Sequence, residues 1–354
     1  MGYPAEIGRE QQAIAPVFAH LLGQEKAKTL LTRSLAAGRT PHAYLFRGPE
    51  GVGKQLFAQV MAATLNCRQT LDGAACGNCS SCRKFRSGNH PDFVVIRPEQ
   101  GSIKIDRIRE LIKALSYPPY ESATRVVLLE DIHTMRREAA NSLLKTLEEP
   151  PENNLLILTV ESSKSILSTI SSRCQTIPFF QLSQGDTVRI LLEKGMEEKT
   201  AVLLARLSEG SPGRALLFRK TEMVETWEKV ITVVMDSSAS GDSQVGLLLQ
   251  MAEVMAGLKE NLFPFLGLLR IWIRDALVYP VGQEKRDGAM GNTRWTGRDW
   301  LGNRAPEELF NKLRAIDRAE QELGRNCNRT LVCEILLFRL QQQEGNNHRV
   351  FYNE

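Results

Sequence analysis

A glycine-rich turn between a predicted strand and a predicted helix is the feature that most restricts the fold of this 354-residue chain. The turn has the sequence Gly-Pro-Glu-Gly-Val-Gly-Lys over 48–54 and follows a strand predicted over 42–47. Glycines let several backbone N–H groups point into one concavity, and a lysine that opens the next helix can reach a phosphate. The alternative is a tight strand-to-helix turn that holds no ligand. The predicted phosphate-binding residues are Gly48, Gly51, Gly53 and Lys54.

Strands and helices alternate through the first half of the chain. Short apolar runs at 92–97, 125–130 and 155–160 have the composition of strands buried in a sheet. Between them, 105–116 and 136–149 carry apolar residues at helical spacing, and the second helix stops before two prolines. This order predicts an α/β fold whose parallel sheet has helices on both faces.

The second half of the chain lacks this alternation and is predicted to be almost entirely helical. We therefore predict three domains, with a strand-and-helix domain over 1–178, a small helical domain over 179–219 and a helical domain over 220–354. A Gly- and Arg-containing loop is predicted over 280–304.

Charge and hydropathy exclude a membrane protein but few other classes. The net charge of +4 permits a nucleic-acid partner without indicating one. The most apolar stretch, 262–278, contains a proline and several charged residues, so it predicts a buried helix rather than a membrane span. No apolar leader is visible at the N-terminus, and we expect a cytoplasmic protein with no membrane partner.

The residues that would place magnesium and water differ from those of an active ATPase. The position after the loop lysine is Ser or Thr when its hydroxyl binds Mg²⁺, and here it is Gln55. The strand predicted over 125–130 ends in Glu130-Asp131, which reverses the usual Asp-Glu order. The side chain at the metal position is then one methylene too long, and the side chain at the base position is one methylene too short. A shift of about 1 Å can cost on the order of a hundredfold in rate. Weak or absent hydrolysis is predicted, and the sequence leaves open whether ATP or ADP binds.

Four of the seven cysteines form a cluster. Cys67, Cys76, Cys79 and Cys82 have the spacing C-x8-C-x2-C-x2-C, and four thiolates suit tetrahedral Zn²⁺. A disulfide set is unfavourable in a reducing compartment, so a structural zinc insertion over 67–82 is predicted. Two alternatives are four free thiols and a zinc module that binds DNA through the basic residues of 83–86.

Several further segments carry motifs of one protein family. They are Gly23-Gln24, His42 to Phe46, His90-Pro91-Asp92, Asn141 to Pro151, and Ser172-Arg173-Cys174. Together with the phosphate loop and the cysteine cluster, they resemble the bacterial DNA polymerase III clamp-loader subunits, which are AAA+ proteins. The resemblance covers roughly residues 18 to 218 and is looser at 326–331.

This resemblance implies an architecture and a set of partners. The three predicted parts become a RecA-like AAA+ domain with a zinc insertion, a small helical lid and a helical collar. The expected partners are gamma/tau and delta subunits in a hetero-pentamer, and through that complex the sliding clamp and primed DNA. Gln55 and Glu130-Asp131 favour the delta-prime type, which has a damaged ATP site, over a gamma/tau-like motor subunit.

The resemblance also implies roles for three more residues. Arg173 matches an arginine finger that reaches a neighbouring subunit's ATP, where a guanidinium stabilises charge developing on the γ-phosphate. Thr159 matches the sensor-1 position and Arg214 the sensor-2 position on the lid. The alternatives are a surface ion pair for Arg173, and for Thr159 a side chain that binds local backbone.

Overall fold

The computed structural model describes residues 16–38, 40–71, 73–162, 164–236, 242–278 and 305–342. It forms two compact units, which are described separately below. The first unit comprises Met1–Lys194 and Glu209–Gly213, and the second comprises Gly195–Ser208 and Arg214–Glu354. The loop predicted over 280–304 lies outside the described residues, and the three-part division remains a prediction.

The first unit is built on a sheet of five parallel strands in the order β2-β3-β4-β1-β5. The four strands predicted from the sequence, over 42–47, 92–97, 125–130 and 155–160, are confirmed. The short strand β5 was not predicted, because its four residues show no apolar run. The strands are β1 (Ala43–Arg47), β2 (Phe93–Ile96), β3 (Arg125–Leu129), β4 (Asn154–Val160) and β5 (Gln175–Pro178).

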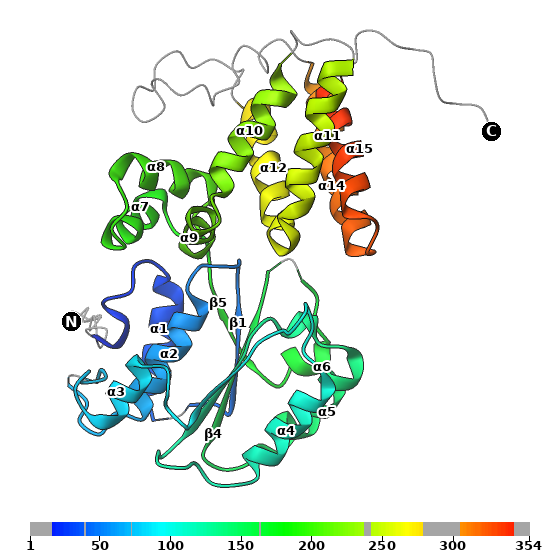
Figure 1. Ribbon diagram of the computed structural model, residues 1–354. Helices are drawn as coiled ribbons and strands as arrows, with labels where there is room; N and C mark the ends of the chain where they lie inside the picture. Colours follow the sequence, from blue (N-terminus) through cyan, green and yellow to red (C-terminus); the bar gives the residue numbers. More distant parts are fainter. Residues whose placement is uncertain are drawn as a thin grey trace, which may run out of the picture. The chain divides into compact units, whose positions relative to one another are not determined.

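Helices cover both faces of this sheet, as predicted (Figure 1). One face carries α1 (Glu25–Ala36), α2 (Lys54–Leu65) and α3 (Ser80–Arg86). The other carries α4 (Ile105–Leu115), α5 (Arg137–Glu148) and α6 (Ser168–Ser171). The short 3-10 helices of this unit are η1 (Pro16–Phe18) and η2 (Ile132–Thr134), and α7 (Gln184–Glu193) follows the sheet.

The two hydrophobic layers follow from the alternation of side chains along each strand. Tyr44 and Phe46 of β1 belong to the layer under α1 and α2, whereas Ala43 and Leu45 belong to the layer under α4 and α5. All four side chains are buried. Since both faces are covered, the strands need apolar residues at successive positions, which explains their continuous apolar runs.

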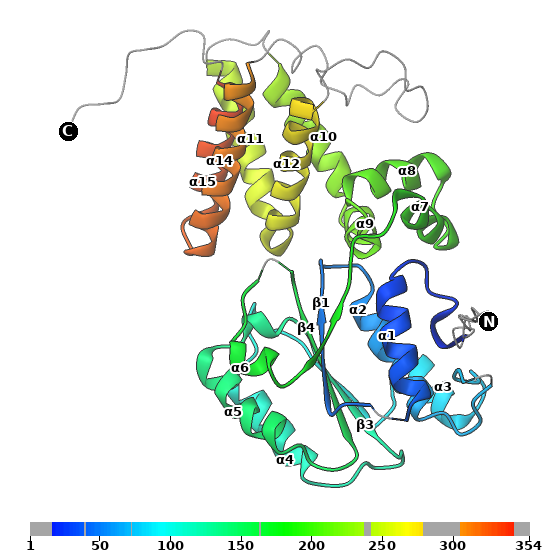
Figure 2. The ribbon, with the colours of Figure 1, turned by 180° about the vertical axis from the view of Figure 1, so that it is seen from behind.

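All the regular secondary structure described in the second unit is helical. Its helices are α8 (Glu198–Leu207), α9 (Pro212–Lys220, which begins in the first unit), α10 (Met223–Met235), α11 (Asp242–Gly257), α12 (Leu262–Val278), α14 (Pro306–Gly324) and α15 (Arg329–Gln341), with η3 (Lys259–Asn261). Within the bundle α11 packs on α15, and α14 packs on both α12 and α15 (Figure 2). Across the described ranges, no helix is both long enough and apolar enough to cross a bilayer.

Candidate functional site

The predicted phosphate loop leaves the carboxyl end of β1 and opens α2. The N–H of Gly48 donates to the carbonyl of Val160 at 3.1 Å, which fixes the loop against the end of β4. Gly51 and Gly53 have φ of 72° and 99°, in the left-handed region that favours glycine. Backbone N–H groups in such a turn, at the start of a twelve-residue helix, suit an anion.

Lys54 is turned back onto this loop. Its Nζ donates to the carbonyls of Gly48 at 2.7 Å and Pro49 at 2.6 Å, and the residue is only 8% exposed. Burial lowers the pKa of Lys54, while the nearby carboxylate of Asp131 opposes this shift. A phosphate that bound in the loop would therefore compete with two carbonyls for the ammonium group. Gln55 follows on α2 and is half-buried.

The reversed acidic pair lies at the carboxyl end of β3. One oxygen of Glu130 accepts a hydrogen bond from Arg97 Nε at 3.1 Å, and the other is buried without a hydrogen-bond partner among the described residues. Burial raises the pKa of Glu130, although Arg97 opposes the shift. Asp131 has φ 50°, and its N–H donates to Thr159 Oγ1 at 3.0 Å. Arg97 thus binds the carboxylate of Glu130, the residue that the sequence predicts at the metal position, and Thr159 binds the backbone of Asp131.

Residues far along the chain close over the phosphate loop. Ser211 Oγ donates to the carbonyl of Glu50 at 2.8 Å, and the N–H of Gly213 donates to the carbonyl of Gly51 at 2.9 Å. A Cβ on Gly213 would lie 2.7 Å from the Cα of Gly51, so this approach requires glycine. Arg214 is the first residue of the second unit after this segment, and its role as sensor 2 remains a prediction.

Gln24 braces the same loop from the N-terminal side. Its Nε2 donates to the carbonyl of Phe180 at 2.5 Å and of Val52 at 3.3 Å, and its Oε1 accepts the N–H of Phe180 at 2.9 Å. The side chain is buried, and φ of 61° places the residue in the left-handed region. Gln24 is part of a family motif, but no local pattern predicts that it binds Phe180, which is 156 positions further along the chain.

The four cysteines of the cluster converge as their spacing predicts. Their sulfur atoms all lie within 4.8 Å of one another. The Sγ of Cys82 is 3.9 Å from that of Cys76 and 3.7 Å from that of Cys67. Sulfurs around a tetrahedral ion with Zn–S bonds near 2.3 Å are about 3.8 Å apart, so the arrangement fits a metal ion. The cluster can therefore hold a metal.

Backbone amides and burial act on these thiols in opposite directions. Cys79 is the N-cap of α3, where the N–H of Cys82 lowers the pKa of the Cys79 thiol to about 6. Burial raises the pKa of the Cys82 thiol to about 12. Four thiolates so close together need a cation, because like charges at this distance oppose ionisation.

The basic residues after the cluster bind groups in the same chain. Arg83 donates to the carbonyl of Asn78 at 2.6 Å, and Arg86 donates to that of Gly77 at 2.7 Å. Both carbonyls belong to the turn between two of the cysteines. Lys84 pairs with Glu121 at 2.5 Å. Arg83 and Arg86 thus stabilise the turn between the cysteines, and Lys84 joins α3 to Glu121.

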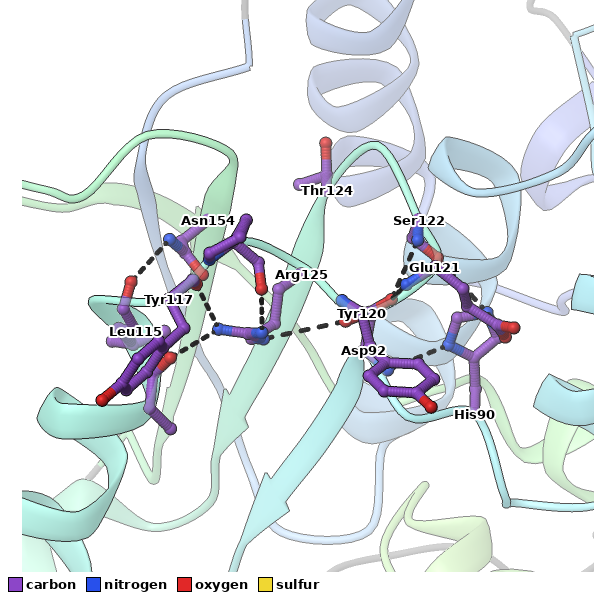
Figure 3. Close-up of polar contacts among 12 residues, drawn as sticks. His90, Asp92, Leu115, Tyr117, Tyr120, Glu121, Ser122, Thr124, Arg125 and Asn154 are labelled. Carbon is purple, nitrogen blue, oxygen red and sulfur yellow. Dashed lines mark hydrogen bonds and ion pairs between the residues drawn. The ribbon is translucent and has the colours of Figure 1, made fainter.

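A buried histidine joins the cysteine insertion to the sheet (Figure 3). His90 Nε2 lies 3.1 Å from the hydroxyl of Ser81 and 3.4 Å from that of Ser122, while its Nδ1 accepts the N–H of Asp92 at 3.2 Å. A neutral ring whose Nδ1 accepts must carry its proton on Nε2, so His90 cannot take a proton from Ser81. The Ser-His contact is therefore structural and does not form a nucleophile-base pair.

Arg173 lies at the end of the sheet where the parallel strands begin, whereas the phosphate loop lies at the end where they finish. It precedes β5, which runs parallel to β1 with Tyr44 opposite Gln175 and Arg47 opposite Pro178. The loop begins where β1 ends, so the length of β1 separates the two sites by roughly 15 Å at about 3.3 Å per residue. This separation exceeds the reach of an arginine side chain. Arg173 cannot serve the phosphate loop of its own chain.

Known proteins are similar to this chain over about half of its length. The family described as "DNA polymerase III, delta subunit" matches residues 23–183, which contain the phosphate loop, the cysteine cluster and Arg173. Residues 23–183 are therefore similar to this family over a little less than half of the chain. The chain is 36% identical over 210 residues to the DNA polymerase III subunit delta' of Bacillus subtilis, covering 59% of this chain and 63% of that protein.

Two further DNA polymerase III subunits are similar over a comparable share of the chain. Identity is 33% over 215 residues to the delta' subunit of Pseudomonas aeruginosa, covering 57% of this chain and 65% of the relative. Identity is 36% over 208 residues to the tau subunit of Escherichia coli, covering 56% of this chain and 32% of that relative. The chain thus spans less than two thirds of each of these relatives. A gamma subunit-related protein from Thermotoga maritima superposes with a TM-score of 0.47 at 18% identity, covering 90% of this chain and 99% of that one.

The structure brings together most, but not all, of the site residues that clamp-loader motifs indicate. The four cysteines meet, and the loop glycines, Lys54, Asp131 and Thr159 gather at the carboxyl edge of the sheet. Arg97, which holds Glu130, and Glu148, which pairs with Arg173 at 2.6 Å, were not predicted. Each partner is 25 or more residues away in sequence, and local pattern carries no signal for such a contact.

Proposed function

We propose that this chain is a delta-prime-type clamp-loader subunit that does not act as an ATP-hydrolysing motor. In this role it belongs to a hetero-pentamer with gamma/tau and delta subunits, which loads the sliding clamp onto primed DNA. The observation that carries the proposal is the separation of Arg173 from the chain's own phosphate loop. An arginine at that edge serves a site on another subunit.

The chain's own loop supports a non-motor role. Gln55 supplies no hydroxyl for Mg²⁺, and the carboxylate of Glu130 is held by Arg97. Hydrolysis by this chain is then weak or absent. The intact glycines and Lys54 still suit an anion, so the proposal allows ATP or ADP to bind without turnover.

Arg173 supplies the chemistry that this subunit contributes. A guanidinium carries a permanent charge and presents parallel N–H donors, which match the oxygens of a γ-phosphoryl group. Placed at a neighbouring gamma/tau-type site, it stabilises the charge that develops during phosphoryl transfer. The subunit therefore acts as a stator that completes its neighbour's active site.

The cysteine cluster is proposed as a structural Zn²⁺ site with the ligands Cys67, Cys76, Cys79 and Cys82. The sulfur separations and the all-thiolate donor set fit this ion. Four protein ligands leave no position for substrate. The competing DNA-binding module is less favoured, because the basic residues that follow the cluster already bind carbonyls and a carboxylate of the chain.

The domain division is part of the same proposal. Residues 1–178 form the AAA+ domain with its cysteine insertion, 179–219 the lid, and 220–354 the collar that joins the subunits. The helix-rich composition of the second unit supports a collar of packed helices.

The decisive experiment is an ATPase measurement on a reconstituted loader that contains this chain. Arg173→Ala is expected to lower DNA- and clamp-stimulated turnover by about 10³-fold or more, the range of a lost arginine finger. Arg189→Ala is the matched control, since Arg189 is an exposed arginine on α7 that pairs with Glu193 at 3.4 Å. Equal turnover in the two variants would contradict the proposal.

The motor alternative is tested on the purified chain alone. We expect it to hydrolyse ATP no faster than a Lys54→Ala variant does. Rapid turnover that disappears with Lys54→Ala would instead identify a gamma/tau-like motor.

A further inference from the structure

Arg173 is held by a specific carboxylate in the free chain. We propose that Glu148 is a competing partner of Arg173, which occupies the guanidinium until a neighbouring subunit's nucleotide replaces the carboxylate with phosphate. This inference rests on the proposed function, because it concerns how the same arginine becomes available to the neighbour.

The guanidinium of Arg173 is fixed from two sides. Its Nη2 lies 2.6 Å from Glu148 Oε1, the last residue of α5. Its Nη1 donates to the carbonyl of Thr169 in α6 at 2.9 Å and lies 3.4 Å from Ser172 Oγ. A free arginine side chain samples many rotamers, and these contacts on different elements select one of them. The side chain is therefore ordered before any neighbour arrives.

The position of Glu148 on its helix favours a role for this pair. Glu148 ends α5, where the helix dipole places partial negative charge and disfavours a carboxylate. Glu149 is the C-cap, so a second carboxylate adds to the repulsion. Arg173 offsets this accumulated negative charge. The two residues thus stabilise each other locally although they come from separate parts of the chain.

The exposure of the pair makes it reversible. The side chains of Arg173 and Glu148 are 34% and 48% exposed. An ion pair in such contact with water contributes little and breaks at little cost. Phosphate in a subunit interface is a stronger partner for arginine, because it carries more charge, accepts two parallel N–H donors and is partly shielded from water. The expected direction of exchange is from carboxylate to phosphate.

This exchange predicts competition between Glu148 and the neighbour's nucleotide. Removing the charge of Glu148 should tighten nucleotide binding at the neighbouring site, because the arginine no longer has to leave a carboxylate. The effect should be about two- to fivefold, the size of a partly exposed ion pair. This tightening of nucleotide binding should occur only when the guanidinium of Arg173 is present.

The test uses the reconstituted loader and a fluorescent, non-hydrolysable ATP analogue as the probe. Glu148→Gln is compared with Glu149→Gln, which removes the same charge one residue further along and touches no part of Arg173 in the contacts described above. Both substitutions are also made in an Arg173→Ala background. We expect tighter binding with Glu148→Gln alone, no change with Glu149→Gln, and no effect of Glu148→Gln without Arg173.

The outcomes separate this inference from the proposed function. If Arg173→Ala leaves stimulated ATPase unchanged, the proposed function fails, and the role of Glu148 fails with it. If Arg173→Ala abolishes stimulation, two results would overturn the role of Glu148 alone. One is equal binding by Glu148→Gln and Glu149→Gln, and the other is weaker binding by Glu148→Gln.

Discussion

Arg125 and Asp92 hold a single loop from opposite sides, with Arg125 Nε 3.8 Å from Asp92 Oδ1 (Figure 3). Asp92 is fully buried, and Arg125 is nearly so. Their partners are backbone groups in the last turn of α4 and in the loop that leads from α4 to β3. Asp92 accepts the N–H groups of Tyr120, Glu121 and Ser122 at 2.6, 2.9 and 2.9 Å, and Arg125 donates to the carbonyls of Ala114, Tyr117 and Pro118 at 2.7, 3.0 and 2.8 Å. The two buried charged side chains thus supply the hydrogen bonds that these backbone groups would otherwise make within secondary structure.

The first prediction concerns this brace. Burial raises the pKa of Asp92, but its backbone N–H donors outweigh burial and hold the pKa below its usual value. Asp92→Asn should lower the free energy of unfolding by about 3 kcal/mol, because it leaves Arg125 without a buried counter-charge. Hydrogen exchange should accelerate at the amides of 120–122. Asp106→Asn, at an exposed ion pair in the first turn of α4, is the control. It should cost no more than about 1 kcal/mol and should leave exchange at 120–122 unchanged.

The second prediction concerns the metal. Native mass spectrometry should find one Zn²⁺ per chain, and Cys82→Ser should abolish it, because a ligand is lost from the tetrahedral set. Cys327→Ser is the control, since Cys327 is exposed and lies outside the cluster. Removing zinc with a chelator should increase hydrogen exchange across 67–88, since metal binding and local folding are coupled. A purified chain that carries no zinc, with unchanged protection after chelation, would contradict the zinc assignment.

The third prediction concerns the closure of the phosphate loop. Gly213→Ala should destabilise the first unit by about 1–3 kcal/mol, because the added Cβ meets backbone at 2.7 Å and forces the segments apart. Protection from hydrogen exchange should fall at 48–53. Gly185→Ala in α7 is the control, as its Cβ meets only a hydroxyl at 3.9 Å. Equal protection of the loop in the two variants would show that the Gly213 contact does not hold it.

The fourth prediction concerns pH. Burial lowers the pKa of His90 below its ordinary value of 6.5, while Glu121 and Asp92 oppose the shift and Lys84 adds to it. Between the lowered pKa and 6.5 the unfolded chain binds more protons than the folded chain, so stability falls as pH drops through this window. Below the lowered pKa this contribution stops changing.

The measurement is the melting temperature of the protein and of His90→Gln, followed by circular dichroism from about pH 8 to pH 5. The difference between the two isolates His90 from other titrating groups. It should shrink as the pH falls below 6.5. A constant difference over this range would show that His90 does not titrate differently in the folded chain.

Local sequence was sufficient for the elements that make up the sheet and for the metal site. The buried strands β1, β3 and β4 follow from continuous apolar runs, and the helix α5 ends before Pro150, where the next N–H is missing. The cysteines converge because two Cys-x-x-Cys turns fix three ligands locally. The family motifs then related these elements to clamp-loader subunits, which matches the comparison over 23–183.

Contacts across the sheet could not be predicted in this way. Arg97 binds Glu130 because the parallel register of β2 and β3 brings the ends of these two strands together. Glu148 binds Arg173 because α5 packs on α6, the helix that precedes Arg173. The strand β5 has only four residues and was missed for lack of a pattern.

The amino-acid sequence by itself determined the alternating elements and the four-thiol cluster, and it predicts that the groups that place magnesium are replaced. Those features depend on residue type and short spacing, which act through local backbone geometry. Tertiary structure alone decided that Arg173 lies across the sheet from the phosphate loop, that Glu148 pairs with it, and that residues 211–213 close over the loop. These relationships depend on strand order, strand register and the packing of helices on the sheet, which are set by two hydrophobic layers rather than by any local segment.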